Sequence, residues 1–235
     1  MILRGVDGCP AGWLAVSLDL ATRQVTGKVF PGDAVSLLRD PDVAVTAIDI
    51  PIGLPSRDRP RRVDEMARRR LGSRASSVFP APHRATLPFA SNDYRAACEA
   101  SAEECGKRLS QQSFAILPKI KAVDMVLHEN PELVERVFEV HPELCFQFWA
   151  RPQQIRHPKK SGFGFTERIE LVRSVFGNAA EEIRASISRA EANDDDILDA
   201  FAALWTAERI HSGVAERLPA ELDRDDCGLP MCMWV

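Results

Sequence analysis

Acidic residues with a spacing suited to metal-assisted chemistry stand at the ends of predicted strands and at the start of a predicted helix. Asp49 and Glu139 each lie within a short apolar run. A buried carboxylate is costly unless it is paired, hydrogen-bonded or bound to a metal ion. Carboxylates at corresponding positions of several strands therefore predict a shared cleft. The expected catalytic carboxylates are Asp7, Asp49, Glu139, Asp196 and Asp199.

The chemistry that such a cleft predicts is metal-dependent phosphoryl transfer. Mg²⁺ and Mn²⁺ prefer oxygen ligands from carboxylates and water. Asp196 and Asp199 are three residues apart and therefore share one face of a helix. Two such ions, about 3.5–4 Å apart, can activate a water molecule and stabilise the leaving oxygen of an in-line displacement. The expected metal ligands are Asp7, Asp49, Asp196 and Asp199, with Mg²⁺ or Mn²⁺ as the cofactor.

Structural interpretations of the same acidic residues remain open from the sequence. The acidic run 194–196 can cap the helix that it begins and can favour the helix dipole. Asp7 precedes Gly8 and suits a turn. Asp49 and Glu139 are harder to explain in this way, because each lies inside an apolar strand.

The elements that must position these residues are strands in the first part of the sequence, followed by strands and helices. Three short strands with brief connections begin the chain, which indicates an antiparallel meander. Two further strands follow, separated by helices, and the clearest helix runs from about residue 195 to residue 211. This order predicts an α/β fold with a mixed five-stranded sheet flanked by helices. The expected strands span residues 2–7, 13–18, 24–30, 43–50 and 136–140, with a last short strand over residues 231–235. A further helix is expected over residues 167–176, with Thr166 as its cap.

A helical insertion is expected between the fourth and fifth strands, over about residues 56–135. No internal repeat or low-complexity linker interrupts the sequence, so one domain over residues 1–235 is the simpler interpretation. The first part of the insertion holds nine arginines between residues 57 and 84. Arginine pairs with phosphate in a bidentate fashion, although a solvated helix face balanced by nearby acidic residues explains the pattern equally well.

The composition is that of an ordinary globular protein. The 235 residues are 45% hydrophobic and 27% charged, with a formal net charge of −4. That charge argues against a surface that is basic throughout, but not against a local basic patch. No apolar run has the length of a membrane span, and the N-terminus lacks the pattern of a signal peptide. The six cysteines lack metal-binding spacing, so we expect reduced thiols and a cytoplasmic location.

Six motifs span most of the chain, from about residue 5 to residue 213. They lie at residues 5–13 (GVDGCPAGW), 48–55 (IDIPIGLP), 62–79, 118–124, 139–143 (EVHPE) and 195–200 (DDILDA). Together they resemble the family catalogued as domain of unknown function 429, whose members are described as predicted ribonuclease H-like nucleases. The resemblance implies a ribonuclease H-like fold and a two-metal acidic site. Asp7, Asp49, Asp196 and Asp199 match its motifs, whereas Glu139 has no equally clean counterpart in simple members of that superfamily.

Cationic residues complete the expected site. Three arginines fit the motifs of the resembled family, and two lysines are further candidates for phosphate contacts, with a plain surface position as the alternative. His141 follows Glu139 closely and could orient a carboxylate, shuttle a proton or join the metal shell, or make a structural hydrogen bond. The expected substrate-binding residues are Arg62, Arg68, Arg74, Lys119, Lys159 and His141.

The function that these residues predict is metal-dependent hydrolysis of phosphodiester bonds in a nucleic acid. One alternative is a phosphoryl-transfer enzyme that acts on a nucleotide or small phosphoester. Against that alternative, the sequence contains no phosphate loop with a D-x-G-x-T pattern. The other alternative is a non-catalytic binding protein that retains the fold. The sequence leaves open whether the nucleic acid is DNA or RNA, and it leaves open the oligomeric state.

Overall fold

The computed structural model describes residues 1–32, 34–91 and 93–235. These residues form two compact units, and the chain passes between them more than once. The second unit contains most of the helical segment expected over about residues 56–135, and the single-domain interpretation stays a prediction. The first unit comprises Met1–Ile50, Glu135–Glu216 and Trp234–Val235, and the second comprises Pro51–Val134 and Arg217–Met233.

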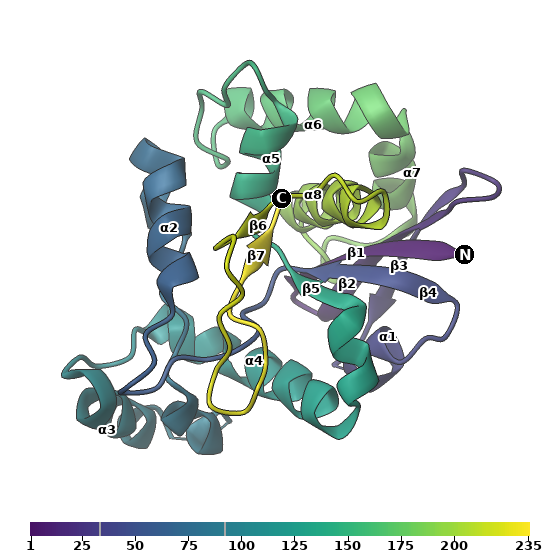
Figure 1. Cartoon of the computed structure of the whole chain (residues 1–235). Coiled ribbons are helices and arrows are strands. Elements are labelled where there is room, and N and C mark those ends of the chain that lie inside the picture. The colour runs from purple at the N-terminus through teal and green to yellow at the C-terminus, as the bar shows by residue number, and fades with distance from the viewer. Residues whose placement is uncertain (33, 92) are drawn as a thin grey trace. The chain divides into compact units, whose positions relative to one another are not determined.

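A five-stranded mixed sheet is the centre of the first unit (Figure 1). Its strands are β1 (Ile2–Cys9), β2 (Gly12–Asp19), β3 (Val25–Phe30), β4 (Val43–Ile48) and β5 (Val137–Glu139). The order across the sheet is β3-β2-β1-β4-β5. β1, β2 and β3 form an antiparallel meander, whereas β4 runs parallel to both β1 and β5. The predicted α/β class and mixed five-stranded sheet are therefore confirmed.

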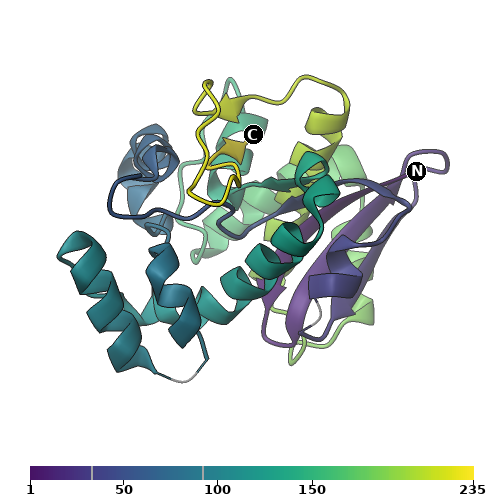
Figure 2. The ribbon, with the colours of Figure 1, turned by 60° about the horizontal axis from the view of Figure 1, so that its bottom comes forward.

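Helices of the first unit cover both faces of this sheet. On one face lie α5 (Pro142–Trp149), α6 (Gly162–Phe176), α7 (Ala179–Ser186) and α8 (Asp194–His211) (Figure 1). The short helix α1 (Ala34–Leu38) lies on the other face (Figure 2). The buried side chain of Arg4, which alternation directs away from α8, donates to the carbonyl of Leu37 at 2.7 Å.

The helix α8 approaches β1 closely because both elements present small residues at their contact. A Cβ atom on Gly5 would lie 2.1 Å from the backbone nitrogen of Leu204 and 2.2 Å from the carbonyl oxygen of Ala200. Any side chain at Gly5 would therefore push the two backbones apart. Ala203, on the same side of the helix, is fully buried. This close contact holds Asp199, the residue before Ala200, near the carboxyl end of β1.

The second unit is mainly helical, and Asp225 connects its segments. This carboxylate is 3% exposed and accepts hydrogen bonds from the N–H groups of Leu54 at 3.0 Å and Leu229 at 2.9 Å. It also forms an ion pair with Arg84. The elements of this unit are α2 (Arg62–Leu71), α3 (Tyr94–Cys105), α4 (Gln111–Glu129) and the 3-10 helices η1 (Gly72–Ser77), η2 (Arg84–Phe89) and η3 (Pro131–Glu135), the last ending at the unit boundary.

The short segments at the C-terminal end form a two-stranded sheet of β6 (Arg217–Leu218) and β7 (Met233–Trp234). Residues 231–235 were expected to form a last short strand, and β7 lies within that range. None of the helices in the described part of the chain has the length and apolar character needed to span a membrane.

Local boundaries differ from the sequence-based expectations at three places. β1 continues past Asp7, because a tight turn after Cys9 lets the strand pair with β2 up to Gly12. The helix α6 begins at Gly162 rather than near Thr166, because the hydroxyl of Ser161 accepts the N–H of Gly164 and caps the helix. The sequence analysis also does not predict α5, whose apolar residues cover nearly its whole surface.

Candidate functional site

Two of the expected carboxylates lie on neighbouring parallel strands and on one face of the sheet. Asp7 lies within β1, two residues after Gly5, and therefore shares the face on which α8 packs. Asp49 directly follows β4, and its N–H donates to the carbonyl of Val6 at 3.0 Å. Since Val6 pairs with Ile48 in the ladder, Asp7 and Asp49 come next to each other at the carboxyl ends of their strands.

The first turns of α8 bring two more carboxylates to this place. The pKa of Asp7 is raised well above its usual range, first by burial and then by repulsion from Asp199, Asp49 and Asp196. This repulsion requires Asp199, Asp49 and Asp196 each to lie near Asp7. We refer to Asp7, Asp49, Asp196 and Asp199 as the acidic cluster. The structure thus brings together all four residues that the sequence predicts as metal ligands, while the metal-binding role itself stays a prediction.

Burial dominates the protonation of the acidic cluster. It raises the pKa of Asp49 to about 7 and the pKa of Asp199 to about 6, although Lys159 opposes both shifts. It also raises the pKa of Asp196, against the hydrogen bond that Asn193 donates. Carboxylates in such surroundings bind protons tightly because they lack enough compensating positive charge. A bound cation would supply that charge.

The run 194–196 serves the helix as well as the cluster. Asn193 is the N-cap of α8, and Oδ2 of Asp196 accepts its backbone N–H at 2.7 Å and its side-chain amide at 3.1 Å. Asp194 forms an ion pair with Arg189 at 2.8 Å. The capping interpretation is therefore correct for Oδ2 of Asp196. The other oxygen, Oδ1, does not cap the helix.

Lys159, one of the predicted substrate-binding residues, lies at the acidic cluster. Its Nζ is hydrogen-bonded to Oδ2 of Asp199 and lies 3.4 Å from Oδ2 of Asp195. The attraction of Asp199 outweighs burial and raises the pKa of Lys159 above its usual value. The lysine therefore stays charged, but one ammonium does not balance all the carboxylates around it.

The acidic cluster fits a hard divalent cation by its chemistry, but not as a ready-made cage. In the described part of the chain, no group of three or more His, Cys, Asp or Glu side chains is arranged so that it could hold a metal ion. Oδ1 of Asp199 is nevertheless buried and has no hydrogen-bond partner. Orphaned buried carboxylate oxygens are rare, and a cation is one means of satisfying them. Binding would require side chains to move, including Lys159.

Glu139 lies on the opposite face of the sheet from the acidic cluster. It pairs with Ile48 in the parallel ladder, and Ile48 pairs with Val6, so all three side chains point away from α8. Val140, the next residue, packs in the core on the α8 face. Glu139 is buried and engaged in interactions of its own. The structure therefore does not bring Glu139 to the other four expected carboxylates.

A buried ion pair between Glu143 and Arg168 lies beside the acidic cluster. Arg168 donates to Glu143 through Nε at 2.9 Å and through Nη2 at 2.8 Å, and both side chains are almost fully buried. Repulsion from Glu143 also raises the pKa of Asp199, by less than burial raises it and by less than Lys159 lowers it. One feature of the sequence could have revealed this pair. Arg168 lies on the apolar side of α6, together with Gly164 and Ile169. His141 precedes this region as the N-cap of α5.

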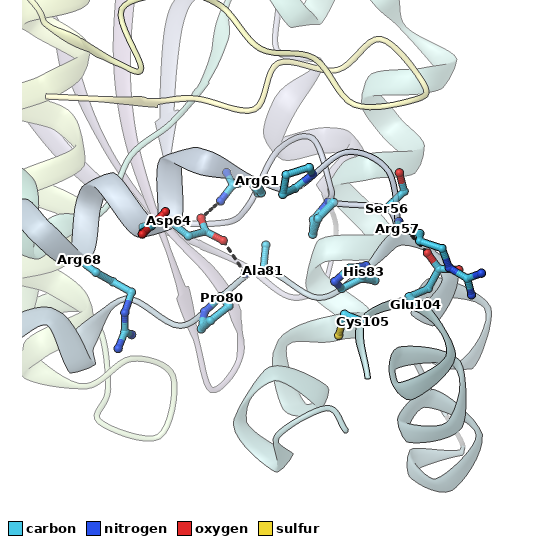
Figure 3. Close-up of a pocket in the computed structure, with 13 residues that line it drawn as sticks. Ser56, Arg57, Arg61, Asp64, Arg68, Pro80, Ala81, His83, Glu104 and Cys105 are labelled. Carbon is cyan, nitrogen blue, oxygen red and sulfur yellow. Dashed lines mark hydrogen bonds and ion pairs between the residues drawn. The ribbon is translucent and has the colours of Figure 1, made fainter. Parts of the chain in front are cut away.

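The remaining expected substrate-binding residues belong to the second unit. Arg62 pairs with Asp223 at 3.3 Å. Arg68 donates to the carbonyl of Val78 at 2.6 Å and lines a pocket of about 460 Å³ (Figure 3). The labelled arginines of this pocket lie apart and do not point at one common position (Figure 3). Arg74 lies in η1 and Lys119 in α4.

Comparison with known proteins identifies a family. The sequence model of the family described as "Protein of unknown function (DUF429)" matches residues 5–224. The matched range includes every residue of the acidic cluster and Lys159, and it confirms the resemblance carried by the sequence motifs. No curated protein and no solved structure matches the chain.

Proposed function

The chain belongs to the DUF429 family, and we propose that it is a metal-dependent nuclease that hydrolyses phosphodiester bonds of a nucleic acid. The observation that carries this proposal is the excess of negative charge at one place. Four carboxylates from two parallel strands and one helix lie near one another, and the ammonium of Lys159 pairs with one of them, Asp199. Such a cluster costs folding free energy and is best explained by a cation that it binds.

A ribonuclease H-like fold is part of the proposal. The acidic cluster combines a residue of the first strand, a residue after the fourth strand and two residues of the last long helix. The resemblance of the motifs implies acidic residues on these same elements. The mixed sheet with helices on both faces is consistent with this fold.

The proposed chemistry assigns the metal ligands to the acidic cluster. Asp7, Asp49, Asp196 and Asp199 would hold one or two Mg²⁺ or Mn²⁺ ions, which would polarise the phosphate and lower the pKa of a bound water molecule. Asp199 has a buried oxygen without a hydrogen-bond partner for this task. Lys159 would bind the anionic phosphodiester by its positive charge.

A cleavage panel tests the proposed function. Single-stranded, duplex, branched and hybrid nucleic acids are incubated with the protein in Mn²⁺, beside Asp7→Asn and the control Asp42→Asn. Asp42 is an exposed carboxylate of the first unit. We expect cleavage of at least one substrate by the natural protein and the control, and a loss of about 10²-fold or more in Asp7→Asn. No cleavage of any substrate, or equal cleavage by Asp7→Asn, would contradict the proposal.

A non-catalytic role is the second candidate, and the ion pair between Lys159 and Asp199 is the observation that favours it. In that case the lysine is a permanent counter-ion, and the carboxylates bind no metal. A thermal unfolding series with increasing Mn²⁺ separates the candidates, because a ligand that binds only the folded protein raises the melting temperature. A rise in the natural protein that is absent from Asp7→Asn favours the nuclease.

A further inference from the structure

One lysine ammonium reaches into the acidic cluster from its edge. The side chain of Lys159 is 31% exposed, whereas that of its partner Asp199 is 6% exposed. Nζ of Lys159 contacts Oδ2 of Asp199 and lies 3.4 Å from Oδ2 of Asp195. The ammonium thus occupies a position beside a buried carboxylate that a metal ion could take instead.

The backbone that carries Lys159 is held as a fixed turn. Ser161 donates to the carbonyl of Pro158 through its N–H at 3.0 Å and through its hydroxyl at 2.8 Å. The turn lies directly on α6, because a Cβ atom on Gly164 would be 2.0 Å from that same carbonyl oxygen. A change of partner at Asp199 therefore needs no movement of the turn. It needs only a swing of the flexible four-carbon stem of Lys159.

Lys159 satisfies only one oxygen of Asp199. The other oxygen, Oδ1, is buried without a hydrogen-bond partner. An ammonium is a compact point charge with three donors, whereas a divalent cation accepts six or more oxygen ligands and can be shared among several carboxylates. A divalent cation can therefore compensate more of the acidic cluster than Lys159 does.

We propose that Lys159 is an exchangeable counter-ion, which neutralises Asp199 in the metal-free protein and is displaced when a divalent cation binds. This inference rests on the proposed function, because it needs the acidic cluster to bind metal. Because the lysine competes with the metal, the apparent affinity for the metal is the intrinsic affinity multiplied by the fraction of molecules in which Lys159 does not pair with Asp199. If the lysine covers Asp199 in roughly nine of ten molecules, its removal strengthens metal binding about tenfold.

Direct measurement of Mn²⁺ binding tests this competition without an activity assay. The EPR signal of free Mn²⁺ is titrated with the natural protein and with Lys159→Gln, Lys159→Arg, Lys160→Gln and Asp7→Asn. Lys160 is the exposed neighbour of Lys159 and provides the matched control. We expect about tenfold tighter binding in Lys159→Gln, affinity close to natural in Lys160→Gln and Lys159→Arg, and no binding in Asp7→Asn.

The outcomes separate this inference from the proposed function. If the natural protein binds Mn²⁺ and Lys159→Gln binds it equally or more weakly, the exchange is wrong while the metal site stands. If neither protein binds Mn²⁺, the exchange and the metal-dependent function are both wrong. Thermal unfolding supplies a second readout. Lys159→Gln should melt below the natural protein without metal, because Asp199 loses its counter-ion, and should gain more from added Mn²⁺.

Discussion

Gly5 of β1 and Ala200 of α8 lie in backbone contact, because a Cβ atom on Gly5 would be 2.2 Å from the Ala200 carbonyl oxygen. This contact sets the distance between the strand that carries Asp7 and the helix that carries Asp199. A glycine two residues before a buried carboxylate is therefore part of the architecture of the acidic cluster.

Gly5→Ala should separate α8 from the sheet and destabilise the protein. The added methyl group meets backbone atoms, which cannot rotate away, so the free energy of unfolding should fall by about 3 kcal/mol, at the upper end for overpacking. Urea unfolding measures the loss. Gly27→Ala is the comparison, because its Cβ atom would meet the side chain of Ile183, which can shift. An equal loss in both variants would show that the backbone contact has no special importance.

The metal-free protein should lose stability as the pH rises from about 4 to about 7. Burial raises the pKa of Asp49 to about 7 and the pKa of Asp199 to about 6, whereas an unfolded aspartate has a pKa of about 3.9. In this window Asp49 and Asp199 bind more protons in the folded state than in the unfolded state, so these two groups make the free energy of unfolding decrease with pH. Guanidinium unfolding at a series of pH values measures this slope.

Asp49→Asn provides the control for that pH dependence, because it removes one of the raised pKa values. Its slope between pH 4 and 7 should be shallower than that of the natural protein, and saturating Mn²⁺ should remove most of the slope by favouring the ionised carboxylates. A slope in Asp49→Asn as steep as that of the natural protein would contradict the raised pKa of Asp49.

The sheet and the acidic cluster could be predicted from local patterns. The strands are short apolar runs between turn residues, and Asp196 and Asp199 share a helix face by their spacing alone. Asp7 and Asp49 meet because the carboxyl ends of adjacent parallel strands lie side by side. Each of these inferences needs only periodicity and the rules that connect strands.

Other features depend on tertiary contacts that the sequence does not display. Glu139 lies in a predicted strand, but it pairs with Ile48 and not with Asp49. Because side chains alternate along a strand, this difference of one residue directs Glu139 to the face opposite Asp49. Lys159 and Asp199 are 40 residues apart, and nothing near either residue indicates their contact. The helix α5 is buried on nearly all sides, so it lacks the one-sided apolar pattern that reveals an amphipathic helix.

Gly164→Ala should displace the turn that carries Lys159. The new methyl group would lie 2.0 Å from the carbonyl oxygen of Pro158, so either the turn or the start of α6 must move. We expect a loss on the order of 1–3 kcal/mol in the free energy of unfolding. Gly162→Ala is a closely matched control, because a Cβ atom there meets no atom within 4 Å. Similar stabilities of the two variants would contradict this account of the turn.

The ion pair of Glu143 and Arg168 should be costly to break from one side. Arg168 binds both carboxylate oxygens of Glu143 at 2.9 and 2.8 Å. It also donates to the carbonyls of Gly164 at 2.7 Å and His157 at 3.3 Å, and thereby anchors the loop that leads to Lys159. Arg168→Met leaves a buried carboxylate uncompensated, so the free energy of unfolding should fall by about 3–5 kcal/mol.

A double variant distinguishes loss of charge compensation from loss of packing. Glu143→Leu combined with Arg168→Met removes both buried charges, so it should be less destabilising than the sum of the two single variants. Urea unfolding of the four proteins completes the double-mutant cycle. If the losses simply add, the two side chains do not stabilise each other. The loop before Lys159 then depends on Arg168 only through the carbonyls of Gly164 and His157.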